Sequence, residues 1–234
     1  MCTTCNCGVI AAPAPSPQRL ELGRALLSRN DAHAAALRLR FEAAGLPVIN
    51  LLSSPGSGKT ALLERLGRDW TGPGRLGVIV GDLATDNDAR RLRAAGIDAV
   101  QITTGQACHL EASMLEPALE QLDLGSLGLL VIENVGNLVC PAAYDLGESL
   151  RLVLLAVTEG EDKPLKYPAM FHSADLVLIN KIDLAEAVAF DRPHARRHIA
   201  QVAPTARILE GSARTGAGMA ELREAITARA LAVR

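Results

Sequence analysis

The stretch SSPGSGKT, residues 53–60, is the part of the sequence that decides the fold. It lies between the apolar run PVINLLSS (47–54) and a helical pattern over Thr60–Trp70. Glycines in such a loop let consecutive backbone N–H groups turn toward a phosphate, and the helix that follows adds the positive end of its dipole. The order of strand, loop and helix therefore predicts a phosphate-binding site.

Each residue at the end of this loop has a predicted task. The backbone of Gly56, Ser57 and Gly58 cradles the phosphates, Lys59 reaches the β and γ oxygens as a catalytic group, and the Thr60 hydroxyl ligates Mg²⁺. The first position departs from the usual pattern, because Ser53 stands where a glycine is expected. The alternative, a chance turn rich in Gly and Ser, is disfavoured by the strand and the helix on either side.

Outward from this loop, apolar runs alternate with helical patterns. Continuous Val, Ile and Leu runs are typical of parallel strands covered on both faces. We expect strands at 47–54, 75–82, 99–104, 127–134, 152–160, 175–181 and 206–212, with helices at 60–70, 86–95, 109–122, 194–202 and 219–231. The predicted fold is an α/β, doubly wound, mostly parallel sheet of about seven strands with helices on both faces. Ligands of such sheets bind beyond the carboxyl ends of the strands.

The predicted organisation has four parts. Residues 1–8 form a flexible Cys-rich head, 9–17 an extended Ala/Pro linker, 18–45 an amphipathic helix that packs on the body, and 46–234 the main domain. The chain has 24 basic and 26 acidic residues, a formal net charge of −2, which argues against binding to nucleic acid or to anionic membranes. No apolar run is long enough to span a bilayer and no secretory signal is evident, so we expect a cytoplasmic protein.

Two later motifs predict guanine recognition. In NKID (180–183), Asp183 can accept hydrogen bonds from two donors of guanine that adenine lacks, and the Lys181 stem can lie along the base; Asn180 completes the motif. Ser212 and Ala213 then resemble the loop that braces the base in GTPases. The expected ligand is GTP.

Carboxylates at strand ends are candidates for the Mg²⁺ side of the site. Glu133 ends a buried strand where GTPases have Asp-x-x-Gly, and Gly136 can offer its N–H to the γ-phosphate. Asp82 is predicted as a catalytic group or Mg²⁺ ligand, while Asp86 is equally well explained as a helix N-cap.

Five cysteines fall into two groups. Cys2, Cys5 and Cys7 form a C-x-x-C-x-C head that can hold one borderline metal ion; an iron–sulfur fragment and a redox thiol pair are the alternatives. Cys108 and His109 follow one strand and Cys140 follows its neighbour, which predicts a second metal site. Here we expect the helix that follows to favour the Cys108 thiolate. Three ligands leave a tetrahedral ion one short, so water or a second subunit would complete it. The remaining histidines are expected at the surface or in caps; they are His33, His172, His194 and His198.

With CTTCNC, SSPGSGKT, TGQACHLEA, ENVGNLVCP and LINKID together, the chain resembles the HypB family of P-loop GTPases. The resemblance implies Mg²⁺-dependent GTP hydrolysis and nickel insertion during [NiFe]-hydrogenase maturation. It also implies a tight nickel site in the head and a weaker nickel or zinc site at Cys108, His109 and Cys140 on a homodimer interface. The implied partners are other maturation chaperones and the hydrogenase large subunit precursor. The His-rich nickel store of some members has no counterpart here.

Four other readings carry different expectations. A small-molecule kinase has no use for NKID, a pure metal-storage protein does not explain the nucleotide loops, and the urease nickel chaperones lack the triple-thiol head; delivery to another metalloenzyme is a fourth reading. GTP is expected to order the loops around Asp82 and Glu133–Cys140 and so change metal affinity. Asn137 stands where GTPases have Gln, so hydrolysis should be slow.

Overall fold

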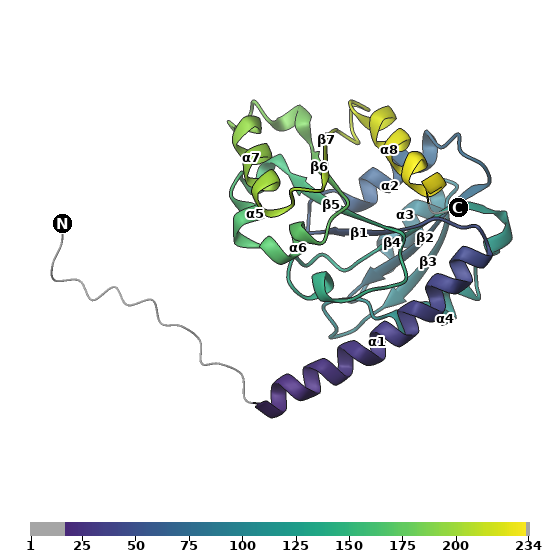
Figure 1. Cartoon of the computed structure of the whole chain (residues 1–234). Coiled ribbons are helices and arrows are strands. Elements are labelled where there is room, and N and C mark those ends of the chain that lie inside the picture. The colour runs from purple at the N-terminus through teal and green to yellow at the C-terminus, as the bar shows by residue number, and fades with distance from the viewer. Residues whose placement is uncertain (1–16, 233–234) are drawn as a thin grey trace.

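The computed structural model describes residues 17–232. Its centre is one sheet of seven parallel strands in the order β3-β2-β4-β1-β5-β6-β7, which confirms the predicted doubly wound architecture (Figure 1). The strands are β1 Val48–Ser53, β2 Arg75–Asp82, β3 Asp98–Thr103, β4 Leu127–Glu133, β5 Leu150–Ala156, β6 Leu176–Asn180 and β7 Arg207–Glu210. Central strands β1 and β4 are buried at every residue, as expected for strands covered on both faces.

Helices cover both faces of this sheet. One face packs on α2, α3 and α8, and the other packs on α1 and α4 beside β2–β4 and on α6 and α7 beside β5 and β6. The helices are α1 Pro17–Ala43, α2 Lys59–Arg68, α3 Asn87–Ala94, α4 Ala112–Leu119, α5 Lys163–Lys166, α6 Pro168–His172, α7 Arg192–Val202 and α8 Met219–Ala232. Each face thus has its own apolar core.

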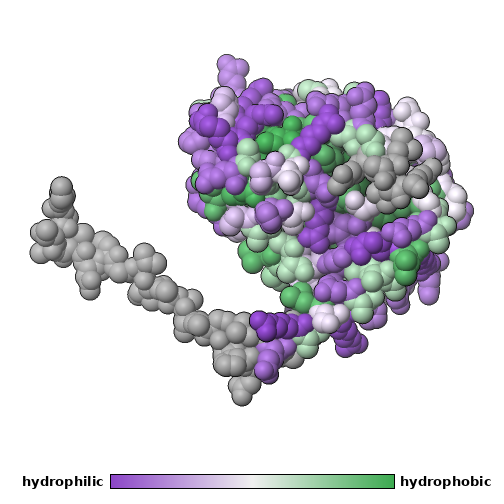
Figure 2. Space-filling view, in the orientation of Figure 1, coloured by the Kyte–Doolittle hydropathy of each residue, from purple (hydrophilic) through white to green (hydrophobic). Residues whose placement is uncertain are grey.

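Helix α1 forms as predicted and packs through its second half. Asn30, Ala34, Leu37 and Phe41 recur on one side of the helix and are buried. Figure 2 shows hydrophilic and hydrophobic residues side by side along α1 on the visible face. Leu39 of this helix is exposed. The helix therefore gives only one narrow side to the body, with Asn30 as a buried polar member that the apolar pattern did not reveal.

The strand order sets where a ligand can bind. Strand β1 lies between β4 and β5. The connection that follows β1 leads to β2 on one side of it, and the connection that follows β4 leads to β5 on the other side. This reversal opens a crevice at the carboxyl end of β1. The glycine-rich loop follows β1 at that point. The loops after β2, β3 and β4 lie on one side of it, and the loops after β6 and β7 lie on the other.

The structure differs from the sequence predictions at three element boundaries. The helix expected from His109 begins at Ala112, because Glu111 has an extended backbone. Strand β5 ends at Ala156, and the rest of that apolar run forms a 3₁₀ turn, Val157–Glu159. Helix α7 begins two residues earlier than expected, at Arg192, with Asp191 as its N-cap. Within residues 17–232, no helix has the length and apolarity that a bilayer crossing needs.

Candidate nucleotide and metal sites

A cleft of about 390 Å³ lies at the carboxyl end of β1. The glycine-rich loop, the ends of β2 and β4 and the start of α3 contribute to it. Its walls are Pro55, Gly56, Gly58, Lys59, Thr60, Ala61, Asp82, Leu83, Asp88, Arg91, Glu133, Val135 and Gly136. The structure thus brings the predicted phosphate-binding and Mg²⁺-binding groups to a single cleft.

Ser53 organises the phosphate loop from below. Its Oγ accepts hydrogen bonds from Lys59 Nζ at 3.1 Å and from Ser57 Oγ at 2.5 Å, and it donates to the Ser54 carbonyl. Burial lowers the pKa of Lys59, because the ammonium loses water and the nearby Glu133 only partly compensates. The departure from the usual glycine therefore has a structural purpose: this serine holds the lysine in the loop.

Glu133 faces the loop from the end of β4. Its Oε1 accepts a hydrogen bond from Thr60 Oγ1 at 3.0 Å, while its buried Oε2 has no partner among the described residues. Burial raises the pKa of Glu133 to about 7, although Lys59 and the Thr60 hydrogen bond oppose the shift. A carboxylate oxygen left unpartnered beside a threonine hydroxyl matches the oxygen ligands that Mg²⁺ prefers. These residues fit a Mg²⁺ ion.

The acidic residues after β2 have different surroundings. Burial alone would raise the pKa of Asp82, but hydrogen bonds from Thr85 and Ala84 outweigh it and hold the pKa below its usual value. Asp86 lies at the N-cap of α3, yet its side chain makes no capping bond and pairs with Arg90 instead. The cleft contains Asp88, which the sequence analysis did not consider.

The NKID loop docks on the phosphate loop. Asn180 Nδ2 donates to the Ser57 carbonyl at 2.9 Å, and Lys181 Nζ donates to the Gly56 carbonyl at 2.6 Å. A Cβ on Gly58 would lie 2.9 Å from the Asn180 amide, so the two loops need a glycine there to meet. The backbone N–H of Ile182 donates to the Gly211 carbonyl, which ties NKID to the loop of Ser212 and Ala213.

Asp183, the predicted guanine acceptor, lies at the edge of this assembly. Arg214 Nε is 3.3 Å from Asp183 Oδ2, and the Arg214 side chain is largely exposed. Ser212 is fully buried and its hydroxyl accepts a hydrogen bond from the Thr215 N–H at 3.2 Å. The loops after β1, β6 and β7 are therefore already joined around the place where a base would lie.

The second metal cluster consists of Cys108, His109 and Cys140, whose ligand atoms all lie within 4.8 Å of one another. The Cys108 thiol donates to Cys140 Sγ at 3.0 Å, and Cys108 Sγ lies 3.8 Å from His109 Nδ1. The Tyr144 ring stacks on the His109 ring with centroids 3.9 Å apart. Two thiols and an imidazole at this spacing are a ligand set for nickel or zinc.

Two expectations about this cluster are wrong. The strands that precede Cys108 and Cys140 are not neighbours, because β2 lies between β3 and β4. Cys108 is not at the start of a helix, because α4 begins at Ala112. The hydrogen bond to Cys140 and burial raise the pKa of the Cys108 thiol, so the apo site favours the neutral thiol rather than the thiolate. Metal binding must therefore release protons from this cluster.

The remaining predicted residues complete the picture. The N–H of His194 donates to Asp191 Oδ1 at the start of α7, and its ring lies 4.2 Å from that of His198, one turn along the helix. His172 Nδ1 lies 3.1 Å from the Val202 carbonyl, and His33 Nδ1 lies 3.9 Å from a Glu116 oxygen. The metal-binding head falls outside the described residues; its members are Cys2, Cys5 and Cys7.

Comparisons with known proteins agree with this geometry. The family model for the CobW/HypB/UreG nucleotide-binding domain matches residues 47–210. The hydrogenase maturation factor HypB of Azotobacter vinelandii is 54% identical over 90% of this chain and 70% of its own length. The hydrogenase/urease maturation factor HypB of Helicobacter hepaticus is 44% identical over 92% and 89%.

A solved structure gives the same answer in three dimensions. HypB from Helicobacter pylori in complex with nickel superposes with a TM-score of 0.83 at 44% identity, covering 86% of this chain and 95% of that one. The family match spans both the nucleotide cleft and the Cys/His/Cys cluster. By fold, by site and by sequence, the chain belongs to the HypB family.

Proposed function

We propose that this protein is a nickel-binding GTPase that assists nickel delivery and insertion during [NiFe]-hydrogenase maturation. The observation that carries the proposal is the short segment Glu133–Cys140, which begins at the Mg²⁺ side of the nucleotide cleft and ends at a metal-binding thiol. Relatives named as hydrogenase maturation factors and a nickel complex of one of them support the cargo and the process.

In this proposal the chain's own groups divide the work of hydrolysis. The N–H groups of the phosphate loop and Lys59 bind the phosphates, Thr60 and Glu133 hold Mg²⁺, and Asp183 selects guanine. When bound, Mg²⁺ supplies positive charge that stabilises the developing charge on the phosphoryl oxygens. Asn137 directs its amide at the Cys108 carbonyl instead of the cleft, which is in keeping with slow hydrolysis.

The Gly136 backbone connects nucleotide state to metal. A Cβ at Gly136 would lie 3.0 Å from Pro55 Cα and 3.3 Å from Lys59 Nζ, so this glycine lies directly against the phosphate loop. A γ-phosphate that accepts its N–H would fix this point, and hydrolysis would release it. The Cys/His/Cys cluster is then a nickel or zinc site whose affinity depends on the bound nucleotide.

The three-ligand cluster also supports a homodimer. A tetrahedral ion needs one more ligand, from water or from a second copy of the chain. Val139, next to Cys140, is 63% exposed, so an apolar side chain lies beside the cluster in position for an interface. We also propose the cytoplasmic location, the four-part division of the chain and the partnership with other maturation chaperones and the hydrogenase large subunit precursor.

Nickel titration tests the proposal. Wild type should show a tight site in the head and a weaker one in the body. A Cys2→Ala, Cys5→Ala, Cys7→Ala triple variant should keep only the body site, and the affinity of that site should differ between GDP and a non-hydrolysable GTP analogue. Lys59→Ala should abolish GTP hydrolysis and this nucleotide dependence while leaving nickel binding to the head intact. Equal affinities in the two nucleotide states would refute the coupling.

A second destination has support of its own. Relatives from Helicobacter are named hydrogenase/urease maturation factors, so delivery to urease is the alternative function. Transfer of nickel from the loaded protein to apo-hydrogenase and to apo-urease, measured side by side, separates the two. A strain lacking this protein should lose hydrogenase activity and regain it when nickel is supplied in excess, whereas its urease activity should not depend on the deletion.

A further inference from the structure

Two asparagines of the Glu133–Cys140 segment hold the Cys108–Leu110 loop at both ends. Asn134 Oδ1 accepts a hydrogen bond from the Leu110 N–H at 3.2 Å. Asn137 Nδ2 donates to the Cys108 carbonyl at 3.2 Å. The two bonds flank His109. The backbone of Cys108–Leu110, which carries two of the metal ligands, is therefore held by side chains of the Glu133–Cys140 segment, and that segment begins at the nucleotide cleft.

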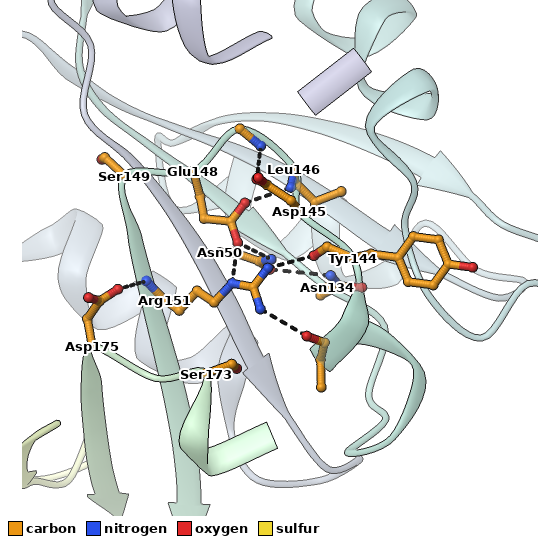
Figure 3. Close-up of polar contacts among 12 residues, drawn as sticks. Asn50, Asn134, Tyr144, Asp145, Leu146, Glu148, Ser149, Arg151, Ser173 and Asp175 are labelled. Atoms are coloured by element: carbon orange, nitrogen blue, oxygen red, sulfur yellow. Dashed lines mark hydrogen bonds and ion pairs between the residues drawn. The ribbon is translucent and has the colours of Figure 1, made fainter. Parts of the chain in front are cut away.

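Asn134 is fixed by the sheet. It is fully buried, and its Nδ2 donates to Asn50 Oδ1 on β1 at 3.3 Å. Asn50 Nδ2 in turn donates to Glu148 Oε1 at 3.2 Å, and Arg151 Nε donates to the same carboxylate at 2.6 Å (Figure 3). A buried network with this many satisfied groups is rigid, because moving one member leaves others without partners.

The same network supports Cys140 from the other side. Arg151 Nη1 donates to the Ala142 carbonyl at 3.0 Å and Nη2 donates to the Tyr144 carbonyl at 2.8 Å. Figure 3 shows the Arg151 guanidinium between the Tyr144 carbonyl and Glu148, with the Tyr144 ring turned away from it. That ring stacks on His109. One fixed base therefore underlies both halves of the metal cluster.

Asn137 has a different kind of support. It is half-buried and follows Gly136 directly, and Gly136 lies against Pro55 and Lys59 of the phosphate loop. Its Oδ1 accepts from the Val139 N–H at 2.9 Å, and its side chain also hydrogen-bonds the Cys108 thiol, so its described hydrogen bonds go to loops rather than to the sheet. A displacement of Gly136 must move Asn137, while Asn134 can stay where it is.

We propose that Asn137 is the positioning residue that transmits the nucleotide state to the metal cluster, and that Asn134 is an anchor that holds the Leu110 end of the loop equally in both nucleotide states. When Gly136 moves toward a γ-phosphate, Asn137 draws the Cys108 carbonyl with it, and the Leu110 end of the loop stays held by Asn134. The distance from Cys108 and His109 to Cys140 changes as a result. This inference rests on the proposed coupling of GTP to nickel and names the residue that carries it.

The test uses the full-length triple variant without head thiols, so that nickel reports only the body site. Nickel affinity is measured by competition with a chromophoric chelator, once with GDP and once with a non-hydrolysable GTP analogue. Without further change the two affinities should differ at least fivefold, in the range typical of coupled sites. Asn137→Ala and the near-isosteric Asn137→Asp, which keeps the acceptor for Val139 but loses the donor to Cys108, should both bring the ratio to within twofold.

Asn134→Ala is the matched control, because it removes the other bond to the same loop. It should weaken nickel binding by the same factor in both nucleotide states and so preserve the ratio. Thermal melts and GTP-analogue affinity, measured on every variant, separate these effects from misfolding and from lost nucleotide. The thiolate-to-nickel charge-transfer band should shift with nucleotide in the parent protein and not in the Asn137 variants.

The outcomes are distinct. A ratio that persists in both Asn137 variants overturns this inference and leaves the proposed function standing. A ratio of one in the parent protein overturns both. If Asn134→Ala brings the affinity ratio to one while Asn137→Ala keeps it, the roles of anchor and transmitter are reversed and the proposal is wrong. Arg151→Lys replaces Asn134→Ala in this comparison if Asn134→Ala does not fold.

Discussion

At the scale of single residues, Glu133 is the group whose environment is most unusual. It is only 3% exposed, one of its oxygens has no partner within residues 17–232, and burial raises its pKa to about 7. In the unfolded chain its pKa returns to an ordinary value near 4.5. Between these two values the native protein binds a proton that the unfolded chain has already released.

This difference in pKa predicts that Glu133 lowers the free energy of unfolding in a pH-dependent way. Because the native state binds more protons between about pH 4.5 and 7, raising the pH through that window destabilises the nucleotide-free protein. The loss is complete above the native pKa and absent below the unfolded one. Glu133→Gln keeps an acceptor for Thr60 and removes the titration. We expect the variant to gain stability over wild type on the order of 2–3 kcal/mol as pH rises from 4.5 to 8.

The measurement is urea unfolding of both proteins across this pH range without nucleotide. Glu116→Gln, whose side chain is 55% exposed, is the control and should track wild type at every pH. A constant difference between Glu133→Gln and wild type from pH 4.5 to 8 would show that Glu133 titrates normally. The same variant should bind Mg²⁺ with GTP more weakly, because its neutral amide replaces the negative charge of the carboxylate.

At the scale of elements, α1 depends on one buried polar residue, Asn30, as well as on its apolar side. Asn30 Nδ2 donates to the Asp145 carbonyl at 2.8 Å and Asn30 Oδ1 accepts from the Ala112 N–H at 2.9 Å. Asn30→Ala leaves a partly buried carbonyl and a buried N–H without these partners, which should cost about 2–3 kcal/mol of unfolding free energy. Leu39 on the same helix is 68% exposed, and Leu39→Ala should change the unfolding free energy by less than about 0.5 kcal/mol.

Chemical denaturation of the two variants checks this. Nickel affinity of the body site should fall with Asn30→Ala as well, because Ala112 opens the helix directly after the Cys108–Leu110 loop. If the two variants lose equal stability, α1 is held by its apolar side alone.

The same elements show what the sequence could and could not predict. The sequence predicts long buried strands, such as 127–133, and the loop at 53–60, because their burial and their chemistry are encoded in consecutive residues. The start of α4 was missed, since Leu110 and Ala112 are buried and continue the apolar pattern while Glu111 is extended. Asn30 and Asn134 were missed as well, and so was the contact of Asn137 with the Cys108 loop, because a polar side chain acquires its importance from partners that are distant in sequence.

At the scale of the whole molecule, dimerisation should depend on both ligands. With a formal net charge of only −2, two copies face little long-range repulsion. We expect nickel together with a GTP analogue to raise the dimer fraction in sedimentation velocity more than either alone. Val139→Glu places a charge beside Cys140 and should weaken the dimer at least tenfold while leaving the melting temperature unchanged.

The control for that surface is Val188→Glu, an exposed valine in the segment between β6 and α7. It should leave the monomer–dimer equilibrium unaltered. Equal weakening by both variants would mean that added charge, rather than the surface beside the metal cluster, opposes association.

The order of the strands also separates two kinds of recognition. The phosphate loop follows the central strand β1, the loops proposed to bind the base follow β6 and β7 toward one edge, and the residues proposed to bind the metal follow β3 and β4 toward the other. No described hydrogen bond joins the loop of Asp183 to that of Cys108. Base specificity and metal specificity are therefore separable: in evolution or in the laboratory, a descendant of this protein could change the metal that it binds and keep its preference for the same nucleotide.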